Sequence, residues 1–341
     1  SEYFWEIVTR QRSLALGGNS RREHFPTKET CIDYVNDIDG PETCNTYNML
    51  KLTEDLNRVN HQGMYGDFYE TAIFNHILSA QHPEHGGYVY FTSARPRHYR
   101  NYSAPNKAMW CCVGTGMEDH GKYGQFIWTH DKGMKTEDDA LYVNLFVASE
   151  LNWKERKMVL RQQTAFPYAE TSNIEVTKGK GVFTLKIRKP LWCDNFTVKG
   201  VGFVVDCYEE NGFVCIKRKW KKGDQVEISM PMHASIKPMI NVPQYVAIMY
   251  GPILLGMKSG TEDMRSLIAD DSRFGQYAAG MKLPLDKAPI LLPKHLNDIA
   301  KDLKPIPDKP LHFKLATHME NVINGELQPF FEIHDSRYMM Y

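Results

Sequence analysis

Residues 42–59 read ETCNTYNMLKLTEDLNRV, and this stretch predicts both a helix and part of a metal site. Its apolar side chains recur at the three- and four-residue spacing of an amphipathic helix: Met49, Leu52, Leu56 and Val59. Thr43 stands where it can cap that helix. We therefore predict a helix over residues 45–59, preceded by two potential ligands, Glu42 and Cys44.

Two further stretches repeat the helical spacing. In residues 66–80 the repeat consists of Tyr69, Ile73, Ile77 and Ala80. In residues 116–129 it consists of Met117, His120, Gly124 and Ile127. Long loops rich in Gly, Pro and Asn separate the helices, at residues 17–40 and 81–110. Loops of this length usually line a functional site. We expect helices and site-forming loops over residues 1–135.

The pattern changes to that of β-strands after residue 131. Residues 141–147 alternate between apolar and polar, and further strands are predicted over 182–188, 212–217 and 225–230. Such regular short strands are typical of a β-sandwich, which we place at residues 136–240. Residues 243–256 are predicted to form a buried strand with Gly251-Pro252 at its end, within a second β-rich segment over 241–341.

Composition excludes several classes of function. Lys+Arg and Asp+Glu both number 41, so the chain has no net charge with which to attract nucleic acid or an anionic membrane. No apolar run approaches about 18 residues, so no membrane span is expected. Aromatic residues make up 12%, which suits a sugar site as well as an ordinary core. Seven cysteines do not indicate a disulfide framework.

The cysteines instead indicate a metal site. Glu42 and Cys44 are two residues apart and can face one way, while Cys111 and Cys112 are adjacent at a predicted helix start. Three thiols and one carboxylate match the ligands of zinc, although structural zinc sites usually separate paired ligands by two to four residues. A helix N-terminus also favours a thiolate. Buried free cysteines remain the simplest alternative, and a disulfide between adjacent residues is sterically poor.

Two glutamates add possible acid–base groups. Glu23 lies in a loop that begins with Gly17-Gly18, and Glu70 lies on the helix predicted over 66–80. Taken alone, each is more often a solvated surface charge. Glycoside hydrolysis needs a proton donor and a nucleophile on either side of the anomeric carbon. A metal-held thiolate can serve as that nucleophile.

Several of these segments together resemble one enzyme family. They are GGNSRREHF (17–25), ETCNTYNMLKL (42–52), FNHIL (74–78), GYVY (87–90) and WCCVGTGME (110–118). The set resembles the β-L-arabinofuranosidases of glycoside hydrolase families 127 and 146, with 146 the closer match. PFFEIHDSRY (329–338) resembles the end of the same family's domain, so the likeness spans nearly the whole chain.

The resemblance implies a retaining hydrolase that releases L-arabinofuranose from plant oligosaccharides or polysaccharides. It implies zinc bound by Glu42, Cys44, Cys111 and Cys112. By the same match Cys111 is the nucleophile and Glu23 the general acid/base, while Glu70 and Tyr90 hold the sugar. The implied fold is an (α/α)6 barrel followed by β-sandwich domains, with residues 1–135 as the C-terminal half of the barrel.

The resemblance also implies a partner for this chain. A barrel of six helical hairpins needs about twelve helices of 11–12 residues, and residues 1–135 supply about five. The other half of the barrel, with its sugar-contacting histidines, is therefore expected as a separate or preceding piece. No leader is visible before Ser1. Related bacterial enzymes make the periplasm the expected compartment.

Two other functions stay open at this point. The first is a non-catalytic carbohydrate-binding or scaffolding protein with a structural zinc site. The second is a cysteine hydrolase of the peptidase type, in which His120 or His24 would activate Cys111. No motif places an Asn or Asp to orient either histidine, which disfavours the second.

Overall fold

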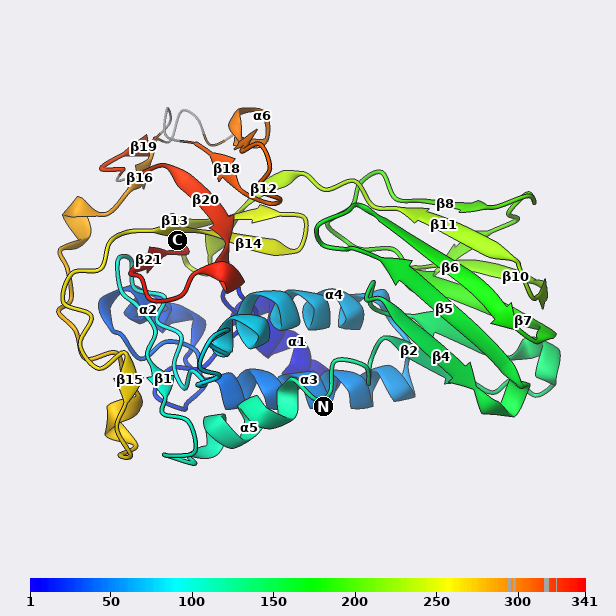
Figure 1. Cartoon of the computed structure of the whole chain (residues 1–341), viewed down its shortest axis with the longest axis horizontal. Coiled ribbons are helices and arrows are strands. Elements are labelled where there is room, and N and C mark those ends of the chain that lie inside the picture. The colour runs from blue at the N-terminus through cyan, green and yellow to red at the C-terminus, as the bar shows by residue number, and fades with distance from the viewer. Residues whose placement is uncertain (293–295, 297–298, 316–318, 323) are drawn as a thin grey trace. The chain divides into compact units, whose positions relative to one another are not determined.

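The computed structural model describes residues 1–341 apart from 293–295, 297–298, 316–318 and 323 (Figure 1). The chain divides into two compact units, and each is described by itself. Unit 1 comprises Ser1–Thr53, Phe68–Gly121 and His233–Tyr341. Unit 2 comprises Glu54–Asp67 and Lys122–Met232. The division after Thr53 falls inside the helix Thr43–Val59, and the division after Asp67 falls inside the helix Gly63–Ala72.

The helices before the first long strands confirm two predictions and correct a third. Their bounds are α1 (Glu2–Gln11), α2 (Asp33–Asn36), α3 (Thr43–Val59), α4 (Gly63–Ala72) and α5 (Cys111–Asp119). The helices predicted over 45–59 and 66–80 are α3 and α4, the latter continuing through a π turn, Ile73–Ile77, and a 3-10 turn, Leu78–Ala80. The helix predicted over 116–129 is wrong, because α5 ends at Asp119 and residues 128–131 pair in a sheet. No helix in the described part of the chain has the length and apolarity that crossing a bilayer requires.

The π turn after α4 connects the helices of unit 1 to its sheet. The Asn75 side-chain amide donates to the carbonyl of Pro252 at 2.8 Å and accepts from the backbone N–H of Leu254 at 2.8 Å. His76 is fully buried, its Nδ1 lies 2.7 Å from the Thr46 hydroxyl, and burial lowers its pKa to about 3. These contacts explain why a short polar segment lies in the core, since each side chain satisfies buried partners.

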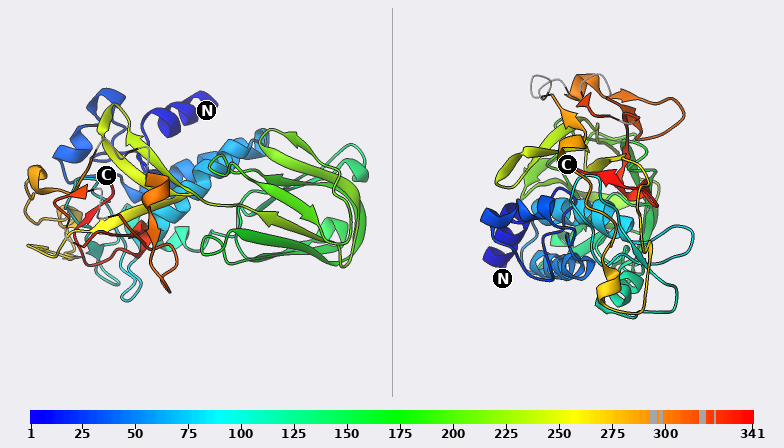
Figure 2. Two further views of the ribbon diagram at one scale, coloured as in Figure 1. Left: turned by 90° about the horizontal axis from the view of Figure 1, so that it is seen from above. Right: turned by 90° about the vertical axis from the view of Figure 1, so that its left-hand side faces the viewer.

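Unit 1 has two layers. Its helices form one layer, and a seven-stranded sheet forms the other (Figures 1 and 2). Its strands are β12 (Ala234–Met239), β13 (Val242–Tyr250), β14 (Ile253–Lys258), β20 (Glu326–Pro329), β18 (Phe313–Lys314), β17 (Lys304–Pro305) and β21 (Tyr338–Met339). The single strand predicted over 243–256 is therefore two strands, β13 and β14. They form a hairpin because Gly251 takes a positive φ of 55° and Pro252 follows it.

Short elements complete unit 1. Tyr102–Ser103 (β1) pairs in parallel with Ile268–Ala269 (β15), and Ile290–Leu291 (β16) pairs with Met319–Glu320 (β19). The helix α6 spans Ile299–Asp302. Loop, helix and sheet residues share one core, which includes Leu14, Leu16, Tyr34, Met239, Leu254, Phe330 and Tyr338. The chain's helical N-terminal part is thus packed, within this unit, on strands from its C-terminal part.

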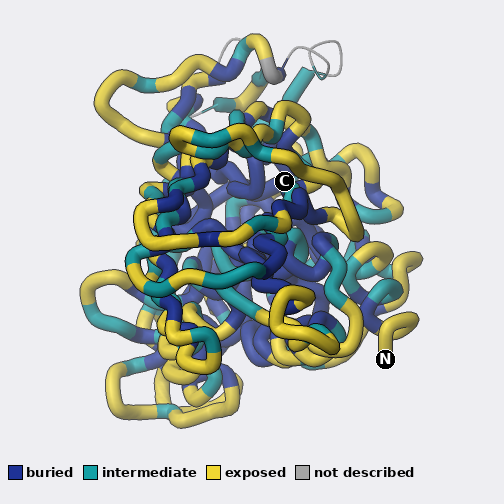
Figure 3. Tube along the Cα trace, turned by 90° about the vertical axis from the view of Figure 1, so that its right-hand side faces the viewer, coloured by how far each residue is buried: buried dark blue, intermediate teal, exposed yellow. Residues whose placement is uncertain are grey.

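Unit 2 contains two five-stranded sheets within its described residues. One has β2 (Trp128–Asp131), β3 (Ala140–Val143), β7 (Lys180–Arg188), β10 (Phe213–Lys221) and β9 (Tyr208–Glu210). The other has β4 (Ser149–Trp153), β5 (Met158–Thr164), β6 (Thr171–Lys178), β11 (Gln225–Ser229) and β8 (Thr197–Gly200). The rings of Trp153 on β4 and Phe183 on β7 pack against each other between the two sheets, with 5.3 Å between their centroids. Exposed residues lie mainly in the turns (Figure 3).

The strands of unit 2 confirm the predictions over 182–188, 212–217 and 225–230 to within two residues at their starts. The strand predicted over 141–147 ends early, at Val143. The architecture is a helical N-terminal part followed by β sheets, as the sequence predicts. The boundaries at residues 135 and 240 stay a prediction.

Candidate metal centre and active site

Four predicted ligands converge in unit 1. The ligand atoms of Glu42, Cys44, Cys111 and Cys112 all lie within 4.8 Å of one another. The Cys112 sulfur lies 3.1 Å from the Cys44 sulfur and 3.5 Å from Glu42 Oε1, and the Cys111 sulfur lies 3.8 Å from the same oxygen. Ligand atoms around a tetrahedral zinc with Zn–S bonds of about 2.3 Å are about 3.7 Å apart. The donor set and its spacing therefore fit zinc. The three cysteines Cys44, Cys111 and Cys112 are all free of disulfide bonds, so their sulfurs are available as ligands.

Two helix N-termini bring these residues together. Glu42 precedes α3, and its backbone N–H donates to the Ser20 hydroxyl at 2.9 Å. Thr43, the first residue of α3, donates its hydroxyl to the carbonyl of Val89 at 2.8 Å. Cys111 begins α5, as the sequence predicts. The N–H of Cys44 donates to the Cys112 sulfur at 3.3 Å, so the positive end of α3 faces a sulfur of α5.

The four ligands differ in exposure. Glu42, Cys44 and Cys112 are buried, Cys112 completely, whereas Cys111 is exposed. Structural zinc sites are closed by their ligands, while catalytic sites keep one position accessible. The accessible Cys111 sulfur is therefore the group of this cluster that can meet a substrate.

Tyr90 connects the cluster to Glu23. Its hydroxyl donates to Glu23 Oε1 and lies 3.1 Å from the Cys111 sulfur. Since one hydroxyl reaches both groups, the Glu23 carboxylate and the Cys111 sulfur lie within about 6 Å of each other. Retaining glycosidases place their acid and nucleophile about 5–5.5 Å apart. The structure thus brings together Glu23, Tyr90 and Cys111, which the sequence analysis named separately.

Hydrogen bonds within the cluster concentrate negative charge on the exposed sulfur. Hydrogen bonds from Cys112 and Cys44 lower the pKa of Cys111 to about 2. The bond to Cys111 raises the pKa of Cys44 to about 12, and burial raises the pKa of Cys112. Burial also raises the pKa of the Tyr90 hydroxyl and of Glu42. Cys111 is consequently the favoured thiolate, and Tyr90 stays protonated as a donor to it.

A strained turn carries Glu23. The backbone N–H groups of Arg21 and His24 donate to each other's carbonyls, both at 2.9 Å, around a two-residue turn. Arg22 and Glu23 have φ values of 50° and 65°, the left-handed conformation of a type I′ turn. Asn and Gly usually fill these positions, and other residues there cost of order 1–3 kcal/mol each. Such strain persists only where surrounding contacts fix the backbone.

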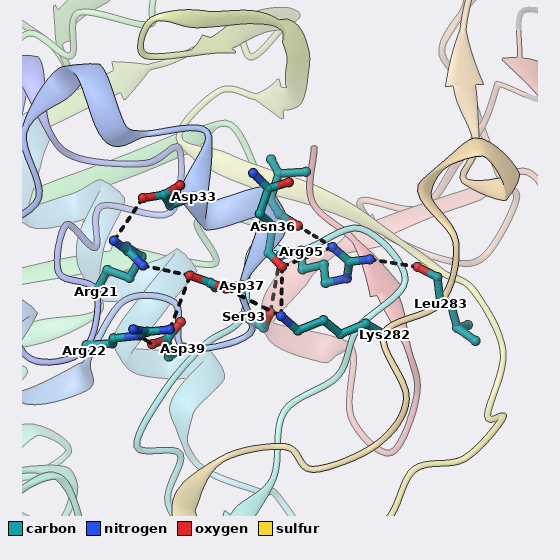
Figure 4. Close-up of polar contacts among 11 residues, drawn as sticks. Arg21, Arg22, Asp33, Asn36, Asp37, Asp39, Ser93, Arg95, Lys282 and Leu283 are labelled. Atoms are coloured by element: carbon teal, nitrogen blue, oxygen red, sulfur yellow. Dashed lines mark hydrogen bonds and ion pairs between the residues drawn. The ribbon is translucent and has the colours of Figure 1, made fainter.

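An aspartate clamp, formed by Asp33, Asp37 and Asp39, fixes this turn (Figure 4). Arg21 pairs with Asp33 at 3.0 Å and with Asp37 at 2.7 Å. Arg22 pairs with Asp39 and, at 3.5 Å, with Asp37. The clamp could not be predicted from the sequence, because neither the turn nor its partners matches a local motif. The only available signal was the run of charges in the loop 17–40.

The remaining predicted residues are placed as follows. Glu70 lies on α4 and is buried, and its sugar-binding role stays a prediction. His120 follows the last residue of α5, about 13 Å along the helix axis from Cys111. His24 is exposed at the end of the strained turn. Within the described residues, the hydrogen-bond partners of the Cys111 sulfur are Tyr90, Glu42, Cys44 and Cys112. None of them is a histidine, which disfavours a peptidase-type cysteine–histidine pair.

Two glycines of α5 provide a matched test of how tightly this helix is packed. A Cβ on Gly116 would lie 2.5 Å from the Tyr88 ring, whereas one on Gly114 would meet nothing within 4 Å. We expect Gly116→Ala to destabilise the protein by about 1–3 kcal/mol through overpacking. Gly114→Ala should stabilise it by about 0.5–1 kcal/mol, because alanine loses less backbone entropy in a helix. Chemical denaturation measures both, and equal effects would contradict the packing of α5 on Tyr88.

Three family models match successive parts of the chain. Residues 1–125 match the GH127 catalytic domain of β-L-arabinofuranosidases, and residues 140–232 match the GH127 middle domain of the same enzymes. Residues 235–341 match a domain of unknown function. No protein of curated function matches the chain.

Solved structures share the fold over 98% of this chain. A GH127 β-arabinofuranosidase is 18% identical with a TM-score of 0.69, and the chain covers 54% of it. A GH127 β-L-arabinofuranosidase from Geobacillus stearothermophilus T6 is 20% identical with a TM-score of 0.67, and 55% of it is covered. A third, described as a glycoside hydrolase, is 19% identical with a TM-score of 0.68, with 60% covered. The chain thus spans little more than half the length of these proteins.

The catalytic-domain match over residues 1–125 and the shared fold make the chain similar to one class of protein, the glycoside hydrolases. Within that class, residues 1–125 and 140–232 are similar to the catalytic and middle domains of the GH127 β-L-arabinofuranosidases. None of these matches distinguishes family 146, so the closer likeness to that family stays a prediction.

Proposed function

We propose that the protein to which this chain belongs is a retaining β-L-arabinofuranosidase that acts on plant glycans. The observation that carries the proposal is the Tyr90 hydroxyl, which contacts both the Glu23 carboxylate and the exposed Cys111 sulfur. This arrangement supports a double displacement, because it keeps a carboxylate and a sulfur within about 6 Å of each other, near the separation of the two groups in retaining glycosidases. The matches to GH127 domains support L-arabinofuranose as the sugar that is released.

The same proposal includes zinc. Glu42, Cys44, Cys111 and Cys112 would hold it, because their donor types and spacing fit a tetrahedral site. When bound, zinc would keep the Cys111 sulfur deprotonated and fix its direction.

Two steps follow from the positions of Cys111 and Glu23. In the first, the Cys111 sulfur forms a bond to the anomeric carbon while the glycosidic C–O bond breaks, and Glu23 gives its proton to the departing oxygen. In the second, Glu23 takes a proton from water as the water oxygen bonds to the anomeric carbon and the C–S bond breaks. Two inversions at one carbon give net retention. Tyr90 stays within hydrogen-bond distance of both groups, and we propose that it and Glu70 also bind the sugar.

The wider setting of the chain belongs to the same proposal. Its helices would form the C-terminal half of an (α/α)6 barrel, completed by an N-terminal half that adds further sugar contacts. Residues 136–240 would form a β-sandwich domain and residues 241–341 the remaining C-terminal β structure. The proposed compartment is the bacterial periplasm.

Metal content and turnover together test this proposal. The full-length protein is expected to bind one zinc per chain and to hydrolyse an aryl β-L-arabinofuranoside. A chelator should abolish the hydrolysis, and added zinc should restore it, because the metal organises Cys111. Zinc retention without cleavage of any arabinofuranoside would instead favour a carbohydrate-binding or scaffolding protein. The exposure of Cys111 argues against that alternative, since a purely structural site has no use for an accessible thiolate.

A further inference from the structure

We propose that the C-terminal domain of unknown function completes the active site, with Arg273 as a positioning residue for Glu23. The segment concerned is the excursion, residues 259–289, which lies between β14 and β16. The inference rests on the proposed role of Glu23 as general acid/base. It assigns a role to residues 235–341, which match a domain of unknown function.

The excursion is attached to the catalytic segment at several points. Trp110, the residue that caps α5, donates its indole N–H to the carbonyl of Asp271 at 3.1 Å. The Asn101 amide donates to the carbonyls of Gly275 and Tyr277, at 2.8 and 3.1 Å. The pairing of β1 with β15 adds backbone hydrogen bonding beside them. These contacts hold the turn that contains residues 271–277 next to Cys111, the first residue of α5.

Arg273 reaches Glu23 from this turn. Its guanidinium pairs with Glu23 Oε2, while the Tyr90 hydroxyl donates to Glu23 Oε1. Each carboxylate oxygen therefore has its own partner, and the two partners come from different domains. The Arg273 side chain is 49% exposed and that of Glu23 is 26% exposed. An ion pair this exposed adds little stability, so its value lies in orientation.

Aromatic stacking and a second anchor hold the excursion in register with the Glu23 loop. The Tyr277 ring stacks on the ring of Phe91, with 4.6 Å between the ring centroids. Phe91 is the residue that follows Tyr90 in the chain. Lys282 donates to the carbonyl of Asn36 at 3.0 Å and lies 3.5 Å from Asp37 of the aspartate clamp (Figure 4).

Arg95 also connects the excursion to the loop that contains the aspartate clamp. Its guanidinium donates to the carbonyl of Val35 at 2.8 Å. It also donates to the carbonyl of Leu283 at 2.9 Å (Figure 4). The excursion thus contacts both the carboxylate of Glu23, through Arg273, and the clamp that fixes its backbone, through Lys282. Rotation of Glu23 about its side-chain torsions would move its carboxyl group away from the leaving oxygen, and an error of about 1 Å in such a group can cost 10²-fold in rate.

Kinetics of Arg273 variants in the full-length, zinc-loaded protein test this inference. With an alkyl arabinofuranoside, whose poor leaving group needs protonation, Arg273→Gln should lower kcat by about 10- to 100-fold and change KM little. With a 4-nitrophenyl glycoside, which needs little protonation, the loss should be several-fold smaller. Arg273→Lys should restore much of the rate. Arg265→Gln is the matched control, because Arg265 lies on the same excursion but pairs with Asp263 at 2.9 Å.

Crystal structures of the wild type and of Arg273→Gln provide a readout that needs no turnover. The inference predicts that Glu23 leaves the Tyr90 hydroxyl in the variant. An unmoved Glu23, or equal losses with both leaving groups, would overturn the role of Arg273 while leaving the proposed hydrolysis intact. A wild type that binds zinc but cleaves neither substrate would refute the proposed function, and the position of Glu23 in the variant would still decide whether Arg273 orients it.

Discussion

Replacing Glu23 by Gln is expected to lower the turnover of an alkyl β-L-arabinofuranoside by about 10²- to 10⁴-fold, the usual contribution of a general acid. Glutamine has nearly the same shape but cannot give a proton to the leaving oxygen. Glu23 contacts Tyr90 and Arg273 and is not one of the four ligands, so zinc should stay bound at one per chain. Steady-state kinetics and metal analysis on the same sample measure both.

Glu29→Gln is the matched control for this change. Glu29 lies in the same loop and is exposed, so its variant should keep full activity. A Glu23→Gln variant with wild-type turnover would contradict the assignment of the acid/base. A loss of zinc together with activity would show instead that Glu23 supports the metal site.

Replacing Cys111 by Ala should have the largest effect. Removal of the nucleophile is expected to lower turnover on the order of 10⁴-fold or more, for aryl and alkyl substrates alike, because alanine cannot form the bond to the anomeric carbon. The variant also loses one of four ligands, so zinc affinity should fall. Assays at saturating zinc separate the two effects, since a metal loss is then corrected and a chemical loss is not.

Cys207→Ala is the control, because Cys207 is the other exposed free cysteine in the structure's described residues and lies in unit 2. Its variant should keep both zinc and turnover. Cys111→Ala activity within a few-fold of wild type at saturating zinc would remove the thiolate from the mechanism and leave a metal site without a catalytic sulfur.

The parts of the fold that the sequence predicts are those in which local pattern and tertiary packing agree. Met49 of α3, Tyr69 of α4 and Ile77 of the π turn that follows α4 are buried members of the predicted apolar repeats. The strands β5, β6 and β11 of unit 2 alternate between more and less buried residues. The helix predicted over 116–129 fails because local spacing conflicts with pairing. Trp128 and Val143 are partners in the β2–β3 ladder, and only tertiary contacts reveal this. The prediction of a single strand over 243–256 is wrong for a simpler reason. The apolar run continues on both sides of the turn at Gly251, so hydrophobicity alone does not indicate the hairpin of β13 and β14.

The candidate site divides in the same way. Glu42, Cys44, Cys111 and Cys112 could be named from the sequence because their chemical types and helix-start positions carry a recognisable pattern. Arg273 could not, because an arginine in an irregular segment has no local signal, and its partner Glu23 is far away in the chain. The strained turn was also invisible, since Arg22 and Glu23 are not residues that a type I′ turn favours.

The coordination of bound zinc tests the central claim most directly. X-ray absorption spectroscopy of the metal in the full-length protein should give three sulfur ligands at about 2.3 Å and one oxygen at about 2.0–2.2 Å. In Cys111→Ala the sulfur count should fall to two. A zinc bound mainly by nitrogen or water, or a sulfur count that Cys111→Ala leaves unchanged, would contradict the claim that Cys111 is both ligand and nucleophile.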